Sequence, residues 1–165
     1  MSYNETPVKE LLENIPQTGK LEWIGIRPGK KQELIKLESA RLEHGSGLEG
    51  DRFRGRISGK RQVTLIQKEH LQVVAEILGK SEIDPGLIRR NLVVSGINLL
   101  SLKHQTFQIG KTVFETTGIC DPCSRMEENL GSGGYNAMRG HGGITAKVIE
   151  AGEIYIGDLV QLWKV

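Results

Sequence analysis

The chain has little cysteine and no long hydrophobic run. Cys120 and Cys123 are the only cysteines in its 165 residues. This excludes a secreted fold built on a disulfide framework and fits a reduced compartment better. No apolar segment approaches the roughly 20 residues that span a bilayer, and residues 1–16 lack the apolar region of a signal peptide. The sequence therefore predicts a cytoplasmic protein with no membrane partner.

The chain also lacks an excess of charge of either sign. Its 22 basic and 20 acidic residues leave a net charge of +2, which argues against a fold that coats nucleic acid through its overall field. Basic residues still concentrate in one segment, where Phe53 is the one aromatic on which a base could stack. They are Arg52, Arg54, Arg56, Lys60 and Arg61. The cluster predicts a small anionic partner and no nucleic acid, with a solvated basic hairpin as the alternative.

The pattern of apolar residues predicts a mostly β fold with a few helices. Short apolar segments between glycine and proline turns are typical of strands. They lie at 21–27, 33–42, 62–66, 92–94, 105–109, 111–116, 144–150 and 159–164. Helices are expected at 7–15, at 68–78 and from Asp121-Pro122 onward, with a long loop at 45–59. This order favours a single β-barrel-like domain over 20–165, preceded by a helical lead-in over 1–19.

Cys120 and Cys123 form a C-x-x-C pair, the sharpest local signal in the sequence. Structural zinc normally needs four ligands, and a thioredoxin-type pair follows the first strand of a βαβ unit, so both of these interpretations are weak. If a helix starts at Pro122, Cys123 lies in its first turn, where unpaired N–H groups and the nearby Arg125 favour a thiolate. Cys123 is therefore the candidate nucleophile or soft-metal ligand, whereas Cys120 is expected to be buried and inert.

Two further segments could recognise an anion. The glycine-rich segment 45–52 could cradle a phosphate, although no Gly-Lys-Ser/Thr follows as in a Walker A motif. Arg89, Arg90 and Asn91 place two guanidinium groups and an amide at the head of a strand, which suits oxyanion recognition. Arg89 would act either as a clamp on a terminal phosphate or as the ion-pair partner of a carboxylate such as Glu49 or Asp51.

A second glycine-rich segment, 131–143, leaves two interpretations open. It forms either a mobile lid or a set of turns. His141 within it is expected to be structural and not a catalytic base.

Five segments together resemble the MOSC family, the domain named after the C-terminal part of molybdenum cofactor sulfurase. In chain order they are G-L-E-G-D-R at 47–52, R-Q-V-T-L-I at 61–66, R-R-N-L-V-V-S-G at 89–96, T-T-G-I-C-D-P-C at 116–123 and G-H-G-G-I-T-A-K-V-I-E-A-G-E-I-Y-I-G-D-L-V at 140–160. The match runs from about Lys20 to Val165. It implies a β-barrel-like fold with a cysteine that either binds the molybdenum of a pterin cofactor or carries sulfur as a persulfide. That cysteine corresponds to Cys123.

The resemblance also implies which residues surround the cofactor. Residues 89–91 correspond to an R-x-N stretch that holds the pterin phosphate side in the mitochondrial amidoxime-reducing component, and Cys120 matches a cysteine of only some members. The residues expected to contact the cofactor are Arg89, Asn91, Asp51, Arg52, Arg61, Thr117 and Arg125. The sequence departs from the family at Phe53, where many members have histidine. The N-terminal barrel domain of the amidoxime-reducing relatives is not found here.

The implied function is that of a molybdenum-cofactor oxidoreductase that reduces N-hydroxylated compounds such as hydroxylamino purines or amidoximes. Two cysteines cannot hold a four-cysteine iron–sulfur cluster, and the sequence shows no flavin motif, so electrons would come from a separate redox protein. Two alternatives remain: a sulfur-transfer protein with a persulfide on Cys123, and a non-catalytic module that binds or stores the cofactor.

Overall fold

A computed structural model describes residues 6–52 and 59–164, and its centre is a closed barrel of seven strands. Around the ring the order is β11-β7-β8-β9-β5-β6-β1, and β1 returns to pair with β11. In chain order the strands are β1 (Gly19–Ile26), β5 (Val63–Gln67), β6 (Leu92–Ser95), β7 (Thr106–Ile109), β8 (Thr112–Ile119), β9 (Ile144–Glu150) and β11 (Leu159–Leu162). All neighbours are antiparallel except β5 and β6, which are parallel. The expected barrel-like, mostly β fold is confirmed.

Buried side chains that alternate with more exposed ones along the strands fill the interior of the barrel. In β7 the residues alternate between half-buried and buried, and Phe107 stacks on Phe114 of β8 with ring centroids 5.2 Å apart. Every residue of β5 is buried, because Val63 and Leu65 face the barrel core while Ile66 packs under the helices outside. A strand covered on both faces carries apolar residues toward both of them, here Val63 and Leu65 on one side and Ile66 on the other.

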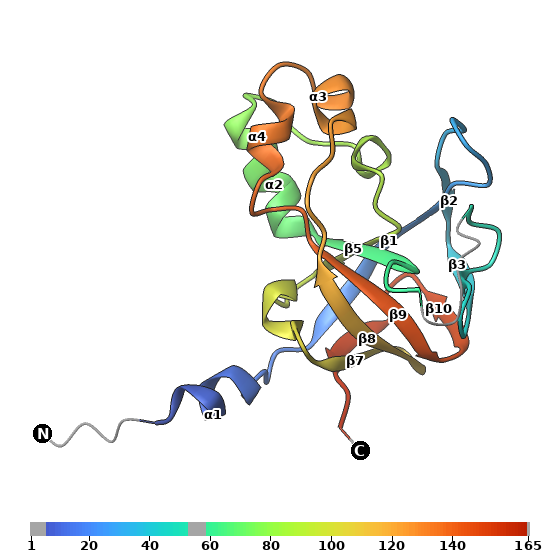
Figure 1. The fold of residues 1–165 in the computed structure, drawn as a ribbon, viewed down its shortest axis with the longest axis vertical. Coiled ribbons are helices and arrows are strands. Elements are labelled where there is room, and N and C mark those ends of the chain that lie inside the picture. The colour runs from blue at the N-terminus through green and yellow to red at the C-terminus, as the bar shows by residue number, and fades with distance from the viewer. Residues whose placement is uncertain (1–5, 53–58, 165) are drawn as a thin grey trace, which may run out of the picture.

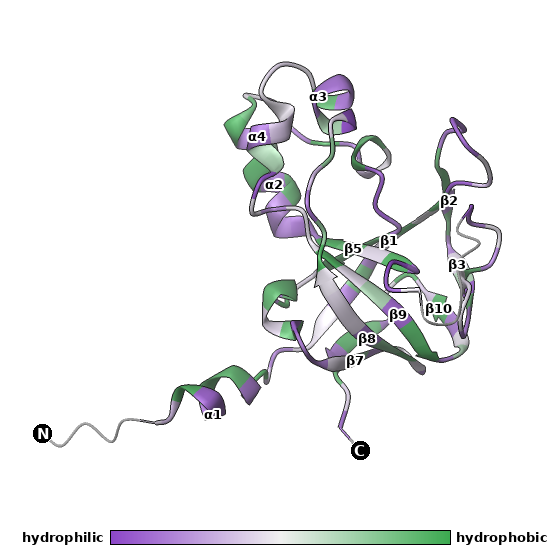
Figure 2. Cartoon of the chain, in the orientation of Figure 1, coloured by the Kyte–Doolittle hydropathy of each residue, from purple (hydrophilic) through white to green (hydrophobic). Residues whose placement is uncertain are grey.

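Helices gather at one end of the barrel (Figure 1). They are α2 (Lys68–Ile77), the 3₁₀ turn η1 (Pro85–Ile88), α3 (Arg125–Leu130) and α4 (Gly134–Met138). Their apolar residues form a second core with the outer side of β5 and β6. Figure 2 shows hydrophobic residues on α2 and α4 and both kinds of residue along the barrel strands. A further 3₁₀ turn, η2 (Leu99–Leu102), leads into β7.

The single strand expected at 33–42 is wrong, because the chain forms two strands in different sheets. β2 (Ile35–Leu37) pairs with β1, whereas β3 (Ser39–Glu43) lies in a second sheet of order β10-β3-β4, with β10 (Gly152–Tyr155) and β4 (Gly47–Leu48). Leu37, Ala40 and Leu42 all pack on the barrel core. Their spacing breaks the period of two, so the chain must bend at Glu38 to turn all three inward.

The prediction that a helix starts at Asp121-Pro122 is also wrong. The backbone N–H of Cys120 still donates to the carbonyl of Gly143, and a residue before proline favours extended backbone, so the chain leaves β8 without turning. The first turn closes where the Met126 N–H donates to the Cys123 carbonyl, and α3 begins at Arg125 after Ser124. Cys123 therefore precedes the helix.

The lead-in contains one short helix, α1 (Val8–Glu13), which projects from the barrel (Figure 1) and buries none of its residues. The expected loop at 45–59 contains β4, and its residues 53–58 lie outside the described part of the chain. None of the helices within residues 6–52 and 59–164 has both the length and the hydropathy needed to cross a membrane.

Candidate cofactor site

A cavity of about 430 Å³ lies between the barrel and the helical end. Five arginines and one cysteine share its wall with short polar side chains and one leucine. The lining residues are Arg27, Leu34, Asp51, Arg52, Arg61, Gln62, Thr64, Arg89, Arg90, Asn91, Asp121 and Cys123. Several cations around one concave wall raise the local positive potential and favour an anionic ligand.

Arg90 is the most deeply placed of these cations, with 2% of its surface exposed. Its Nε donates to the carbonyl of Gly142 and its Nη1 to the carbonyl of Ile88, both at 2.8 Å. Its Nη2 has no hydrogen-bond partner among the described residues. Burial lowers the pKa of the Arg90 guanidinium, against an opposing effect of Cys120, and the neighbouring Arg61 lowers it further. A buried donor without an acceptor is costly, so Nη2 is suited to an anion entering the cavity.

Arg27 and Arg89 are crowded by other cations. Burial lowers the pKa of both guanidinium groups. The charges of Arg52 and Arg125 lower the pKa of Arg27 further. The charges of Arg27 and Arg125 lower the pKa of Arg89 in the same way. Arg89 ends the 3₁₀ turn η1 with φ +61° and precedes β6, so the alternation of strand residues does not apply to it. Two consecutive arginines, Arg89 and Arg90, can therefore line one cavity. An anion between these groups would relieve their mutual repulsion.

Asn91 and Asp51 lie at the cavity, but hydrogen bonds tie both to the protein. Asn91 Oδ1 accepts from the backbone N–H and the hydroxyl of Thr64 at 3.1 and 3.2 Å, and its Nδ2 donates to the carbonyl of Gly25 at 3.2 Å. Asp51 Oδ1 accepts from the backbone N–H of Arg27 at 2.8 Å. Asn91 thus links β5, β6 and β1 and helps to hold the cavity floor. A cofactor contact of either residue stays a prediction.

The two cysteines differ sharply in exposure. Cys123 is exposed and lines the cavity, whereas Cys120 is fully buried and its Sγ accepts from Arg61 Nη2 at 3.6 Å. Since Cys123 precedes the helix, the expected helix-start stabilisation of its thiolate no longer applies. Arg27 and Arg89 line the same cavity as this thiol.

The other residues expected at the site fall into two groups. Arg52 and Arg61 line the cavity, and Arg125 is close enough for its charge to act on Arg27. Thr117 does not line it; its hydroxyl donates to the carbonyl of Lys60 and shares a 2.8 Å hydrogen bond with Thr145 Oγ1. Cofactor contacts of all four stay predictions. Arg54 and Arg56 of the basic cluster lie outside the described residues.

Arg89 was expected to be either a clamp or an ion-pair partner. The ion pairs among described residues are Arg41–Glu43 and Lys147–Glu115. Neither involves Arg89, and its role as a clamp stays a prediction.

Sequence reasoning missed part of the site. Arg27 ends the strand segment expected at 21–27 and was not expected at the site, and Arg90 was expected to recognise an oxyanion beside Arg89 but was not among the cofactor contacts. Thr64 lies in β5 and Gln62 just before it, in a segment that was expected to be core. Gln62 Oε1 accepts from the backbone N–H of Val148 at 3.0 Å. Cationic residues at strand ends were the available signal, because strand ends border the mouth of a barrel.

The glycine-rich segment 131–143 serves close packing at its end. A Cβ on Gly142 would lie 2.0 Å from the Cys120 carbonyl oxygen, and one on Gly143, at φ +87°, would lie 1.8 Å from the Leu65 carbonyl oxygen. Glycine is therefore required where this segment crosses the β8 exit and β5. His141 Nδ1 lies 2.9 Å from the Ala137 carbonyl oxygen, consistent with a structural role. The segment forms turns and a short helix here.

No three His, Cys, Asp or Glu side chains of residues 6–52 and 59–164 gather closely enough to hold a metal ion by themselves.

Comparison with known proteins agrees with this fold. The family model described as "MOSC domain" matches residues 39–161, and the chain belongs to the MOSC family. Among solved structures, the YuaD protein from Bacillus subtilis superposes with a TM-score of 0.77 at 23% sequence identity, covering 92% of this chain and 100% of that one. YiiM from Escherichia coli has a TM-score of 0.67 at 19% identity, covering 88% and 70%. A search of curated proteins found no match.

Proposed function

We propose that this MOSC protein binds the molybdenum cofactor in the arginine-lined cavity, with Cys123 as the protein ligand of the metal, and reduces N-hydroxylated compounds in the cytoplasm. The observation that carries the proposal is the buried Arg90 guanidinium, whose Nη2 is unpartnered among the described residues, in the same cavity as an exposed thiol. An anionic group with a soft metal matches both features.

The residues present fit such a cofactor. Its phosphate is an anion that planar guanidinium forks bind in two-point fashion. Arg27 and Arg89 supply such forks, and Arg90 adds the Nη2 that has no partner among the described residues. A thiolate is a suitable ligand for a metal already held by sulfur. When bound, the cofactor would supply oxygen-atom and electron chemistry, while the protein positions and tunes it.

The reaction needs electrons from outside the chain. Reduction of an N-hydroxylated amine to the amine and water consumes two electrons and two protons. A chain with two cysteines holds no cluster of the four-cysteine type, so we propose an external redox protein as the donor.

A second candidate function is sulfur transfer through a persulfide on Cys123. The exposure of this thiol beside cationic side chains favours it, because a persulfide anion would gain from the same positive charge. Storage of the cofactor without catalysis is the remaining outcome.

The test compares the two cysteines in protein from a host that makes the cofactor. Molybdenum and pterin are measured per chain, together with reduction of benzamidoxime by a reduced viologen dye. We expect Cys123→Ser to abolish turnover and lose molybdenum at an unchanged melting temperature, because an alcohol is a poor soft-metal ligand. Cys120→Ser, the matched control, should keep most of the activity.

Three results would contradict the proposal in different ways. Wild-type protein that carries a persulfide and no molybdenum would establish sulfur transfer. Full loading without turnover would indicate storage. Full activity and metal content in Cys123→Ser would show that the site is misassigned.

A further inference from the structure

The short helix α1 presents an apolar face that its own chain does not cover. Val8, Leu11 and Leu12 share this face, at spacings of three and four residues, and are 70%, 57% and 66% exposed. Figure 2 shows both hydrophobic and hydrophilic residues on this helix. Helices shorter than about 12 residues are marginal in water and take most of their stability from packing of an apolar face. A helix of six residues is therefore expected to pack against another surface.

The chain that follows α1 holds the helix away from its own barrel. Asn14 has extended backbone, with φ −90° and ψ 91°, and Pro16 disfavours the helical conformation for Ile15. Ile15 packs on the barrel core, and β1 begins at Gly19. In Figure 1 α1 projects from the barrel as an arm. An arm on an extended connection suits exchange between two copies of a chain.

An apolar groove of about 380 Å³ lies on the outer side of β1 and β6, beside α2. Its apolar lining residues are Trp23, Leu71, Ile83, Pro85 and Val93, and its polar ones are Glu22, Lys68, Gln72, Ser81 and Glu82. Most of the apolar ones belong to the second core or pack on it. The two hollows beside the base of the arm, by contrast, are lined by more polar than apolar residues. The groove is therefore the better match for the apolar face of α1.

The charges beside the apolar face of α1 complement those of the groove. At 3.6 residues per turn, Lys9 lies next to the apolar face, whereas Glu10 and Glu13 lie on the opposite side of the helix. Glu22 and Glu82 make the lining of the groove acidic overall, against one lysine. Neither they nor Lys9 form an ion pair with a described residue. An apolar helix face flanked by a lysine thus matches an apolar groove flanked by carboxylates.

We infer that α1 docks in this groove on a second copy of the chain, and that two copies exchange their arms around a two-fold axis. Val8, Leu11 and Leu12 contact the apolar residues of the partner groove, and Lys9 approaches Glu82. Glu22 and Trp23 lie on β1, the strand that follows the arm, so each groove begins close to the base of its own arm. One docked helix of six residues is a small interface. The two-fold arrangement forms it twice, which brings the buried area toward the roughly 1,200–2,000 Å² of a stable complex.

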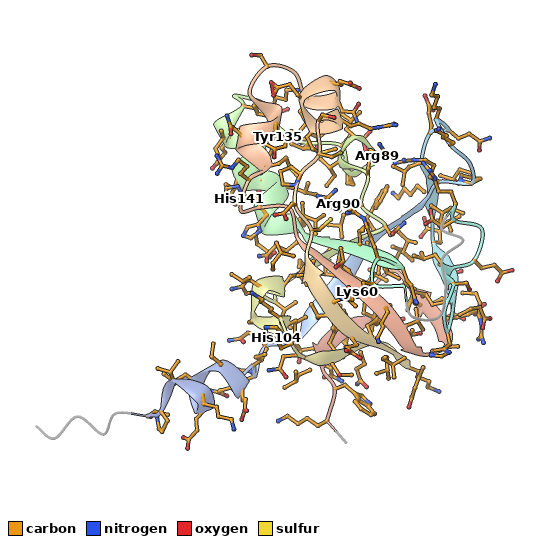
Figure 3. The ribbon with its side chains drawn as sticks, viewed as in Figure 1. Lys60, Arg89, Arg90, His104, Tyr135 and His141 are labelled. Carbon is orange, nitrogen blue, oxygen red and sulfur yellow. The ribbon has the colours of Figure 1, made fainter. Side chains whose placement is uncertain are left out.

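Arm exchange leaves the arginine cavity free. The groove shares none of its lining residues with that cavity. In Figure 3, Arg89 and Arg90 lie far from α1, toward the helical end of the barrel. The dimer therefore does not depend on the proposed function, and cofactor loading does not depend on the dimer.

Sedimentation velocity of the full chain across a concentration series tests the exchange. We expect the wild type to be a dimer and Leu11→Ser to raise its dissociation constant at least about a hundredfold, because each dimer loses two buried leucines worth about tenfold each. Leu11 is exposed within one copy, so the variant should still fold. Ile77→Ser is the matched control, since Ile77 is 58% exposed on α2 and does not line the groove; it should remain dimeric. A wild-type protein that stays monomeric at micromolar concentrations would overturn the inference.

Charge reversal identifies the surface that α1 occupies. We expect Lys9→Glu and Glu82→Lys each to weaken the dimer about tenfold, because the altered contact occurs twice, and the double variant to regain most of the affinity. Glu128→Lys, on the exposed surface of α3, should leave the dimer unchanged. A dimer that responds to Leu11→Ser but not to Glu82→Lys would mean that the helices pair with each other or dock elsewhere, and the groove would be misassigned.

Discussion

The two walls of the arginine cavity are built in different ways. On the strand wall, Arg90, Asn91 and Thr64 are buried, and each is hydrogen-bonded to neighbouring backbone or side-chain groups. On the loop wall, Arg52 and Arg61 are exposed, and the side-chain bond of Arg61 is a 3.6 Å contact with a sulfur.

This difference means that one wall determines the shape of the cavity and the other contributes mainly to the affinity for a ligand. The strand wall is part of the barrel, so its geometry exists before any ligand binds and its loss costs folding energy. The loop wall consists of long cationic side chains whose freedom is lost only on binding. We expect substitutions in the first wall to lower both stability and ligand retention, and those in the second to lower retention alone.

The largest effect is expected where the strand wall meets the glycine-rich segment. Gly143→Ala should lower the free energy of unfolding by roughly 3 kcal/mol or more, since its Cβ would lie 1.8 Å from the Leu65 carbonyl oxygen. Gly140→Ala is the matched control, with φ +80° and nothing within 4 Å of an added Cβ, and should cost only about 1–2 kcal/mol. Denaturant unfolding measures both. Equal losses of unfolding free energy in the two variants would mean that β5 shifts to accommodate the added Cβ at no energetic cost.

An intermediate effect is expected from two arginines on opposite walls. Arg90→Gln should lower the unfolding free energy by about 1–3 kcal/mol, because the carbonyls of Gly142 and Ile88 lose their donors. Arg61→Gln should change it by less than about 0.5 kcal/mol. Both variants should retain less pterin per chain after purification, and the stability measurement then distinguishes the walls. A stable Arg90→Gln with full pterin would remove Arg90 from the site.

The smallest effect extends the comparison to the exposed α3–α4 surface. Backbone hydrogen bonds from Gly133 and Tyr135 hold the pKa of Glu127 below its ordinary value of 4.5. Their stabilisation is therefore fully present above that value and is lost as the pH falls through the lowered pKa. We expect the melting temperature of Glu127→Gln to depend less on pH between about 5 and 3 than that of the wild type. Glu128→Gln, at the neighbouring exposed position, should retain the wild-type slope.

Local chemistry determined much of the fold. Apolar periodicity predicted the barrel strands and the helix α2, which ends before Gly79 at φ +68° as expected. The same reasoning failed at residues 33–42 and at Pro122. Where a helix starts depends on which backbone groups already have hydrogen-bond partners. The Cys120 N–H donates to the carbonyl of Gly143, which lies far along the chain, so the sequence around Pro122 does not reveal this bond.

The sequence by itself determined the barrel and the burial of Cys120. These follow from hydropathy, charge and the family resemblance, all of which are local properties of the residues. Only the tertiary structure decided that Arg27 and Arg90 join the site and that Asn91 bonds to Thr64 and Gly25. Closing a barrel brings strand ends from distant segments to one mouth, and burial then selects which polar atoms pair within the protein and which remain for a ligand.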